Sequence, residues 1–222
     1  MKRTGIALLS AAALLAAGGV SAASSDIKWT YLEGGYITAD GNDNFQTDGY
    51  GVDGSIGFLG NWHAGASYAA TSSSGDFFTQ DLDTDSWTVS VGFHGGLTQT
   101  SQAYFDVGYF NAALDDKSNI LQNGEGDTDG FQLTSGFRFQ PNPKVELGAA
   151  IIYTNGSVDG GEGSNINYND TSVALNGQYF IIPAWSVGAK LGLNGGSGSG
   201  PFSTSSNDVL TIFTRYSFGD LL

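Results

Sequence analysis

The stretch Gly49-Tyr50-Gly51-Val52-Asp53-Gly54-Ser55-Ile56-Gly57-Phe58 shows most clearly how this chain folds. Tyr50, Val52, Ile56 and Phe58 alternate with Gly49, Gly51, Asp53, Ser55 and Gly57. Successive side chains of a β-strand point to opposite faces. The stretch therefore predicts a strand with one apolar face and one face of small or polar residues.

Nine further segments show the same two-residue alternation. The first runs from about Lys28 to Thr38 and the fifth from about Gln102 to Asn111. The others cover about 62–68, 87–94, 131–139, 145–153, 173–181, 187–193 and 210–218. Each is close to the ten or so residues that a tilted strand needs to cross a bilayer.

The connections between these segments alternate between short and long. The short ones lie at 59–61, 95–101, 141–144 and 182–184, and the long ones at 39–48, 71–85, 112–128, 154–169 and 194–207. An even strand number, short periplasmic turns and longer outer loops are typical of outer-membrane barrels. We predict an all-β fold: a ten-stranded antiparallel transmembrane β-barrel of closed up-and-down topology, with extracellular loops and periplasmic termini.

A soluble β-sandwich is the alternative fold, because its strands also alternate. The distribution of aromatic residues favours the barrel, since two aromatic rows around an aliphatic band are typical of a lipid-facing surface. The predicted row at the loop end contains Tyr36, Tyr50, Tyr68, Trp87, Tyr109, Phe131 and Tyr153. The row at the turn end contains Phe58, Trp62, Phe93, Phe139, Trp185 and Phe218.

Residues 1–22 have the pattern of a cleaved secretory signal peptide, which leaves 23–222 as the barrel. Lys2 and Arg3 precede an apolar run from about Ile6 to Ala17, and the small residues Val20-Ser21-Ala22-Ala23 supply a cleavage site. An N-terminal membrane anchor is the alternative. The apolar run is shorter than the roughly 20 residues that a spanning helix needs.

Composition and charge exclude several classes of protein. The chain has 34 Gly, 14 Phe, 10 Tyr, 4 Trp, 4 Pro and no Cys, which disfavours helical and disordered chains and leaves no disulfide. Its net charge is −14, and −16 without Lys2 and Arg3. So acidic a chain is not expected to bind nucleic acid.

The motif Tyr31-Leu32-Glu33-Gly34-Gly35-Tyr36 resembles the start of a family of small xanthomonad-type outer-membrane proteins. One member of that family was once described as an activator of plant immunity. More distantly, the chain is similar to other barrels of eight to ten strands. The resemblance covers the mature chain and implies an outer-membrane and vesicle location, links to signalling, motility and biofilm, and no catalytic residues.

Charged residues on the small-residue faces are expected to line the lumen. They are Glu33, Asp53, Asp106, Arg138, Glu146, Lys190 and Arg215. Unpaired charges in a narrow lumen are costly, so we expect Glu33 to pair with Arg215 and Arg138 with Glu146. Such pairs favour a mostly occluded lumen and a structural or surface role. Bulky aromatic residues that also point inward favour the same interpretation: Tyr31, Tyr104, Phe110, Phe180 and Phe213.

Two functions therefore stay open. At least ten inward positions are glycine, among them Gly51, Gly57, Gly65, Gly92, Gly108, Gly136, Gly148, Gly188 and Gly192. Glycine leaves space, which favours a narrow, porin-like passive channel for small solutes or cations. The bulky inward groups favour the occluded barrel.

The sequence predicts no enzyme, no cofactor and no dedicated metal site. Ten-stranded outer-membrane proteases place His and Asp pairs at the outer rim of the barrel. His63 and His94 both map to the turn end, so no set of nucleophile, base and orienting group can be assembled at the outer rim. A metal-binding or pH-sensing histidine pair is the alternative to two water-bonded lumen histidines. A calcium-like start at Glu125 lacks the glutamate required at its twelfth position, which is Gly136. Gly160-Gly161-Glu162-Gly163 is a single weak match to a calcium-binding repeat.

The expected partners follow from the long connections and from the last strand. The connections are acidic, with Lys117 as their base, so we expect contacts with outer-membrane lipids and with lipopolysaccharide through divalent cations. Plain solvation of the connections and charge repulsion between cells is the alternative. Leu210, Ile212, Tyr216 and Phe218 have the terminal alternation that the barrel-insertion machinery reads, although Gly219–Leu222 follow where a final Phe is usual.

Overall fold

The computed structural model describes residues 27–40, 46–74, 82–116, 125–159, 165–194 and 208–218. In these ranges no helix is long and apolar enough to cross a membrane. The predicted signal peptide (1–22) and the calcium-like stretch at 160–163 lie outside them.

The described residues form ten β-strands, the number predicted. They are β1 (Tyr31–Asp40), β2 (Gln46–Phe58), β3 (Trp62–Ser74), β4 (Leu82–Thr98), β5 (Ser101–Asp116), β6 (Glu125–Asn142), β7 (Val145–Asp159), β8 (Asn165–Ile182), β9 (Trp185–Asn194) and β10 (Asp208–Ser217).

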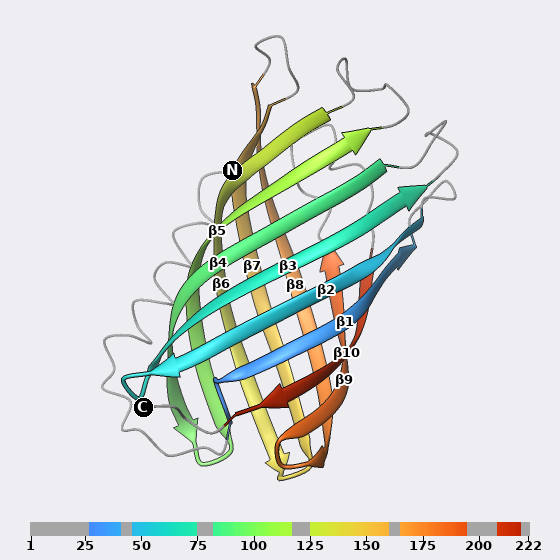
Figure 1. Cartoon of the computed structure of the whole chain (residues 1–222). Helices are drawn as coiled ribbons and strands as arrows, with labels where there is room; N and C mark the ends of the chain where they lie inside the picture. The colour runs from blue at the N-terminus through green and yellow to red at the C-terminus, as the bar shows by residue number, and fades with distance from the viewer. Residues whose placement is uncertain are drawn as a thin grey trace.

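The strands close into one barrel. Each strand pairs antiparallel with its neighbours in sequence, and β1 also pairs with β10, which lies beside it at the seam (Figure 1). The register sets Glu33 of β1 opposite Arg215 of β10 and opposite Asp53 of β2. The prediction of a closed, up-and-down, ten-stranded barrel is confirmed. Closure leaves no sheet edge open to pairing with another chain.

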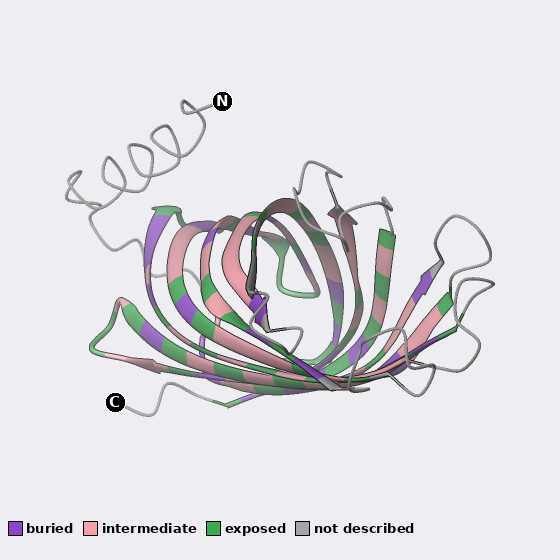
Figure 2. Cartoon of the chain, turned by 90° about the horizontal axis from the view of Figure 1, so that it is seen from above, coloured by how far each residue is buried: buried purple, intermediate pink, exposed green. Residues whose placement is uncertain are grey.

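The two-residue alternation decides which side chains face outward. On β2, Tyr50 is 70% exposed, and Val52 and Ile56 are more than half exposed, whereas Ser55 is 6% exposed. Figure 2 shows this banding along the strands. A soluble sandwich would bury its apolar face. Here the apolar face is the exposed one, and the small and polar residues point inward.

The exposed face has an aliphatic middle and aromatic margins. Val52, Val89, Val91 and Val107 lie on it, with Tyr36, Tyr50, Tyr68, Trp87, Tyr109 and Phe131 towards the loop end and Trp62, Trp185 and Phe218 towards the turn end. These are members of the two predicted rows. Aromatic rings at both margins of an apolar band are typical of a surface that meets lipid.

The strands run further into the long connections than predicted. β4 begins at Leu82, β5 continues to Asp116 and β6 begins at Glu125, so Asp83, Asp85, Asp115 and Asp127 are strand residues and not loop residues. A regular alternation of apolar and polar residues stops before these strand ends, as Ala112-Ala113-Leu114 on β5 shows. Backbone pairing does not need that alternation, and so the strands continue without it.

The first strand was predicted to begin too early. It was placed from Lys28, but pairing starts at Tyr31. Residues 27–30 leave the wall and turn inward, as described below. Lys28, Trp29 and Thr30 still alternate between polar and apolar side chains, which is why the strand was predicted to include them. The apolar Trp29, however, falls on the inward parity of Glu33.

The β2–β3 hairpin turns at Leu59 and Gly60. Both have positive φ, 50° and 75°, and Asn61 N–H donates to the carbonyl of Leu59 at 2.8 Å. Phe58 pairs with Trp62, so the loop has three residues, Leu59, Gly60 and Asn61, and its first two have positive φ. Gly60 adopts this conformation without strain, whereas Leu59 has a side chain that disfavours it.

Candidate functional site: the barrel lumen

Residues Ile27–Thr30, called here the plug, lie inside the barrel at its turn end. Ile27, Trp29 and Thr30 are buried. Phe218 N–H donates to the Thr30 carbonyl at 2.9 Å, and Gly57 N–H donates to Thr30 Oγ1 at 3.1 Å. These bonds fix the plug to β2 and to the end of the β10 strand.

Trp29 reaches across the lumen to the opposite wall. Its ring stacks on His63 at 4.1 Å and on His94 at 4.4 Å between centroids, and the Arg138 guanidinium carbon lies 4.6 Å from its centroid. The indole N–H donates to Gln102 Oε1 at 2.6 Å. Trp29 therefore contacts β3, β4, β5 and β6 and is only 7% exposed.

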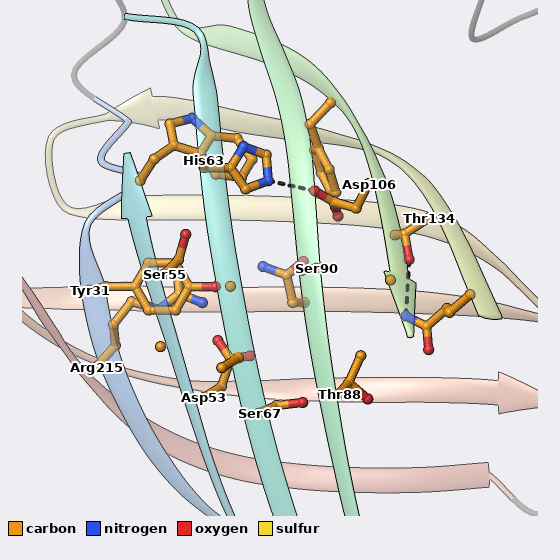
Figure 3. Close-up of a pocket in the computed structure, with 18 of the residues that line it drawn as sticks. Tyr31, Asp53, Ser55, His63, Ser67, Thr88, Ser90, Asp106, Thr134 and Arg215 are labelled. Atoms are coloured by element: carbon orange, nitrogen blue, oxygen red, sulfur yellow. Dashed lines mark hydrogen bonds and ion pairs between the residues drawn. The ribbon is translucent and has the colours of Figure 1, made fainter. Parts of the chain in front are cut away.

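The two predicted lumen histidines meet beneath Trp29. His63 Nδ1 and His94 Nδ1 are 3.1 Å apart, and His63 Nε2 lies 2.5 Å from Asp106 Oδ1 (Figure 3). A contact between two ring nitrogens needs one of them to donate and the other to accept. Both nitrogens of His63 are thus engaged. The described residues contain no group of three or more His, Cys, Asp or Glu side chains arranged to hold a metal ion.

Gly92 makes the His63–Asp106 contact possible. His63 on β3, Gly92 on β4 and Asp106 on β5 are consecutive partners in the register. The two side chains meet over the glycine, and a Cβ atom placed there would overlap both of them.

Other lumen glycines are covered in the same way. Tyr104 lies over its register partner Gly136, Asn176 over Gly148, and Phe213 over Gly188. The space that the sequence assigns to these glycines is therefore filled by the neighbouring strand.

The expected ion pairs are both present. Arg138 Nε donates to Glu146 Oε1 at 2.8 Å across the β6–β7 turn. Arg215 Nη2 lies 2.8 Å from Glu33 Oε2 across the seam. Glu33 also binds the Lys190 ammonium, a contact not predicted because β9 is not adjacent to β1. These charges tie β1, β9 and β10 together inside the barrel.

Asp53 differs from the other lumen carboxylates. Within the described part of the chain it has no ion pair, and its Oδ1 atom has no hydrogen-bond partner. Ser55 Oγ, two residues further along β2, is also buried without a partner. Both residues line a cavity of about 230 Å³ whose boundary includes Trp29, Tyr104 and Arg138.

Comparison with known proteins names no family for this chain and finds only distant structural similarity. No protein-family model and no curated protein matches it. Similar solved structures include the translocator domain of the autotransporter NalP from Neisseria meningitidis (10% identity, TM-score 0.47, 97% of each chain). Others are OprG from Pseudomonas aeruginosa (15%, 0.42, 89% of this chain and 99% of that one) and the KdgM porin in complex with disordered oligogalacturonate (10%, 0.46, 85% and 99%). The barrel assignment rests on the strand register itself.

Proposed function

We propose that this chain is an integral outer-membrane β-barrel with a closed lumen, serving a structural or surface-interaction role. The apolar exterior supports residence in a bilayer, because an exposed apolar band around a closed barrel is stable only against lipid. The resemblance at Tyr31–Tyr36 to small xanthomonad-type proteins supports an outer-membrane location, and vesicles shed from that membrane would carry the chain with them.

One observation carries the proposal of a closed lumen: inside the barrel, the buried ring of Trp29 contacts His63 of β3, His94 of β4 and Arg138 of β6. The Arg138–Glu146 pair and the Glu33 network fill further lumen space. Barrels of about eight strands are filled by their own side chains, and ten strands enclose only slightly more.

The orientation we propose puts the short turns and the plug in the periplasm and the long connections outside. Three tyrosines of the aromatic row at the loop end support placing that row at the level of the lipid headgroups. Each tyrosine donates a hydrogen bond to an outward aspartate on the next strand. The pairs are Tyr36–Asp48 and Tyr68–Asp85 at 2.6 Å and Tyr109–Asp129 at 3.2 Å. Such carboxylates can bridge to lipopolysaccharide phosphates through divalent cations.

We propose no catalytic role. His63 and Asp106 resemble two members of a catalytic triad, but His94 engages the other nitrogen of His63 and Trp29 covers its ring. A general base needs a nitrogen within reach of a substrate proton. A narrow passive channel is the alternative function, supported by the polar cavity beside the plug.

Planar-bilayer recording of refolded protein tests the closed lumen. We expect silence, or small flickering currents, from the wild type and larger, longer openings from Trp29→Ala, because the substitution removes the ring that crosses the lumen. Trp62→Ala is the matched control, since Trp62 faces outward. A large, stable wild-type conductance that admits sugars would overturn the closed lumen and favour a porin.

A further inference from the structure

We propose that the cavity on the loop side of the plug binds a small hydroxylated amine, with its ammonium group held by Asp53 and Ser55. This inference goes beyond the proposed function, because binding in a closed lumen requires no conduction. Figure 3 shows Asp53, Ser55, Ser67, Thr88 and Ser90 around the same space.

Within the described ranges, Asp53 is the one lumen carboxylate that has no cation as its partner. Glu33 pairs with Lys190 and Arg215, Glu146 with Arg138, and Asp106 with His63. The register neighbours of Asp53 are Glu33 and Ser67, neither of which is a cation. An unpaired carboxylate inside a barrel is costly, and a ligand with one positive charge would remove that cost.

The neighbouring hydroxyl favours an ammonium group as that charge. Ser55 is 6% exposed, and among the residues that the structure describes neither its Oγ nor Asp53 Oδ1 has a hydrogen-bond partner. The two residues are two positions apart on β2 and therefore share its inward face. An ammonium group carries three donors and no acceptor, so one such group can serve both oxygens after a small side-chain rotation.

Three cations also line the cavity, but Arg138 is paired with Glu146, and Lys190 and Arg215 are paired with Glu33. The uncharged polar residues of the lining point to hydroxyl groups on the ligand. Ser67, Thr88, Ser90 and Thr134 contribute hydroxyls, and Gln132 and Asn176 contribute amides. These groups both donate and accept hydrogen bonds, as sugar hydroxyls do. The volume of about 230 Å³ lies below the roughly 300–1,000 Å³ of sites for drug-sized ligands, so the ligand is small.

Calorimetric titration of the detergent-solubilised barrel tests this site, with glucosamine and glucose as probes. The experiment runs at low salt and about pH 6.5, where the glucosamine amine is protonated. The two sugars differ in one group, an ammonium against a hydroxyl. We expect saturable binding of one glucosamine per chain. The affinity for glucose should be weaker by about tenfold or more.

Variants locate the binding. Asp53→Asn keeps the side-chain shape and removes the charge, so it should weaken glucosamine binding by about tenfold. Ser55→Ala should weaken it by less. Asp48→Asn is the matched control, because Asp48 lies on the same strand but bonds to Tyr36 on the exterior. Unchanged migration of unboiled samples on a denaturing gel shows that each variant still forms the barrel.

Three results would overturn the proposal: no binding heat with glucosamine, equal affinity for glucose, or equal loss in Asp48→Asn and Asp53→Asn. Competition by potassium at the same concentration as glucosamine would also overturn it, because the site would then select charge alone. Conductance is measured in a separate experiment. Absence of glucosamine binding therefore does not affect the closed-lumen proposal, and a large conductance does not affect the proposed binding site.

Discussion

Replacing Glu33 by Gln should be among the most damaging single changes to the barrel. Glu33 is 4% exposed and lies between Lys190 and Arg215. The amide keeps the shape and removes the charge, which leaves the buried guanidinium of Arg215 without its partner. Breaking a buried pair costs about 3–5 kcal/mol. Because the Lys190 side chain is 36% exposed and can be hydrated, we expect the lower end, about 3 kcal/mol, or about a hundredfold in the folding equilibrium.

Equilibrium urea unfolding in lipid vesicles measures this loss, with the folded fraction read from the heat-modifiable gel band. Adding Arg215→Met to Glu33→Gln should recover much of the stability, because an apolar side chain replaces the stranded charge. Asp48→Asn, in an exposed contact with Tyr36, should leave the midpoint unchanged. The reasoning is refuted if Glu33→Gln behaves like Asp48→Asn.

Three further predictions concern the wall and its turns. Gly92→Ala should destabilise the barrel by about 1–3 kcal/mol, because the new methyl group separates His63 from Asp106; Gly34→Ala, with open space around it, should be neutral in the same urea titration. Leu59→Asn should stabilise the hairpin by up to about 1 kcal/mol, because Asn tolerates positive φ better than Leu; a lowered midpoint would contradict this. Unboiled wild-type protein should migrate differently from boiled protein, and identical migration would refute the closed barrel.

The strands and their faces could be predicted because both depend on local pattern. Odd and even positions of a strand face opposite sides of the barrel wall. A one-residue shift of the register would therefore move every lumen side chain to the lipid side and every lipid-facing side chain to the lumen. The Glu33–Arg215 pair followed from parity combined with closure of the first strand on the last. Lys190 was missed as a third member because its reach across β10 depends on side-chain length and not on the register.

The plug could not be predicted from local pattern. Residues 28–30 alternate between polar and apolar side chains as a strand does, so the sequence predicts a strand there. One signal was present: Trp29 has the same parity as Glu33 and therefore points inward, where a ring of that size needs glycine around it. Gly57, whose inward side meets the Trp29 backbone, supplies some of that room. The partners His63, His94 and Arg138 come from three other strands, which no local window contains.

The seam has a consequence for the order of folding. Glu33 and Arg215 are 182 residues apart in sequence, and contacts of such separation form slowly because a long loop must close first. Thr30 is held by N–H groups from both sides of that seam, Gly57 on β2 and Phe218 after β10. The plug can therefore dock fully only after the last strand has joined the first. Residues that the ribosome makes among the earliest of the barrel are the last to reach their places, and a fluorescence change of Trp29 during refolding marks the end of assembly and not its start.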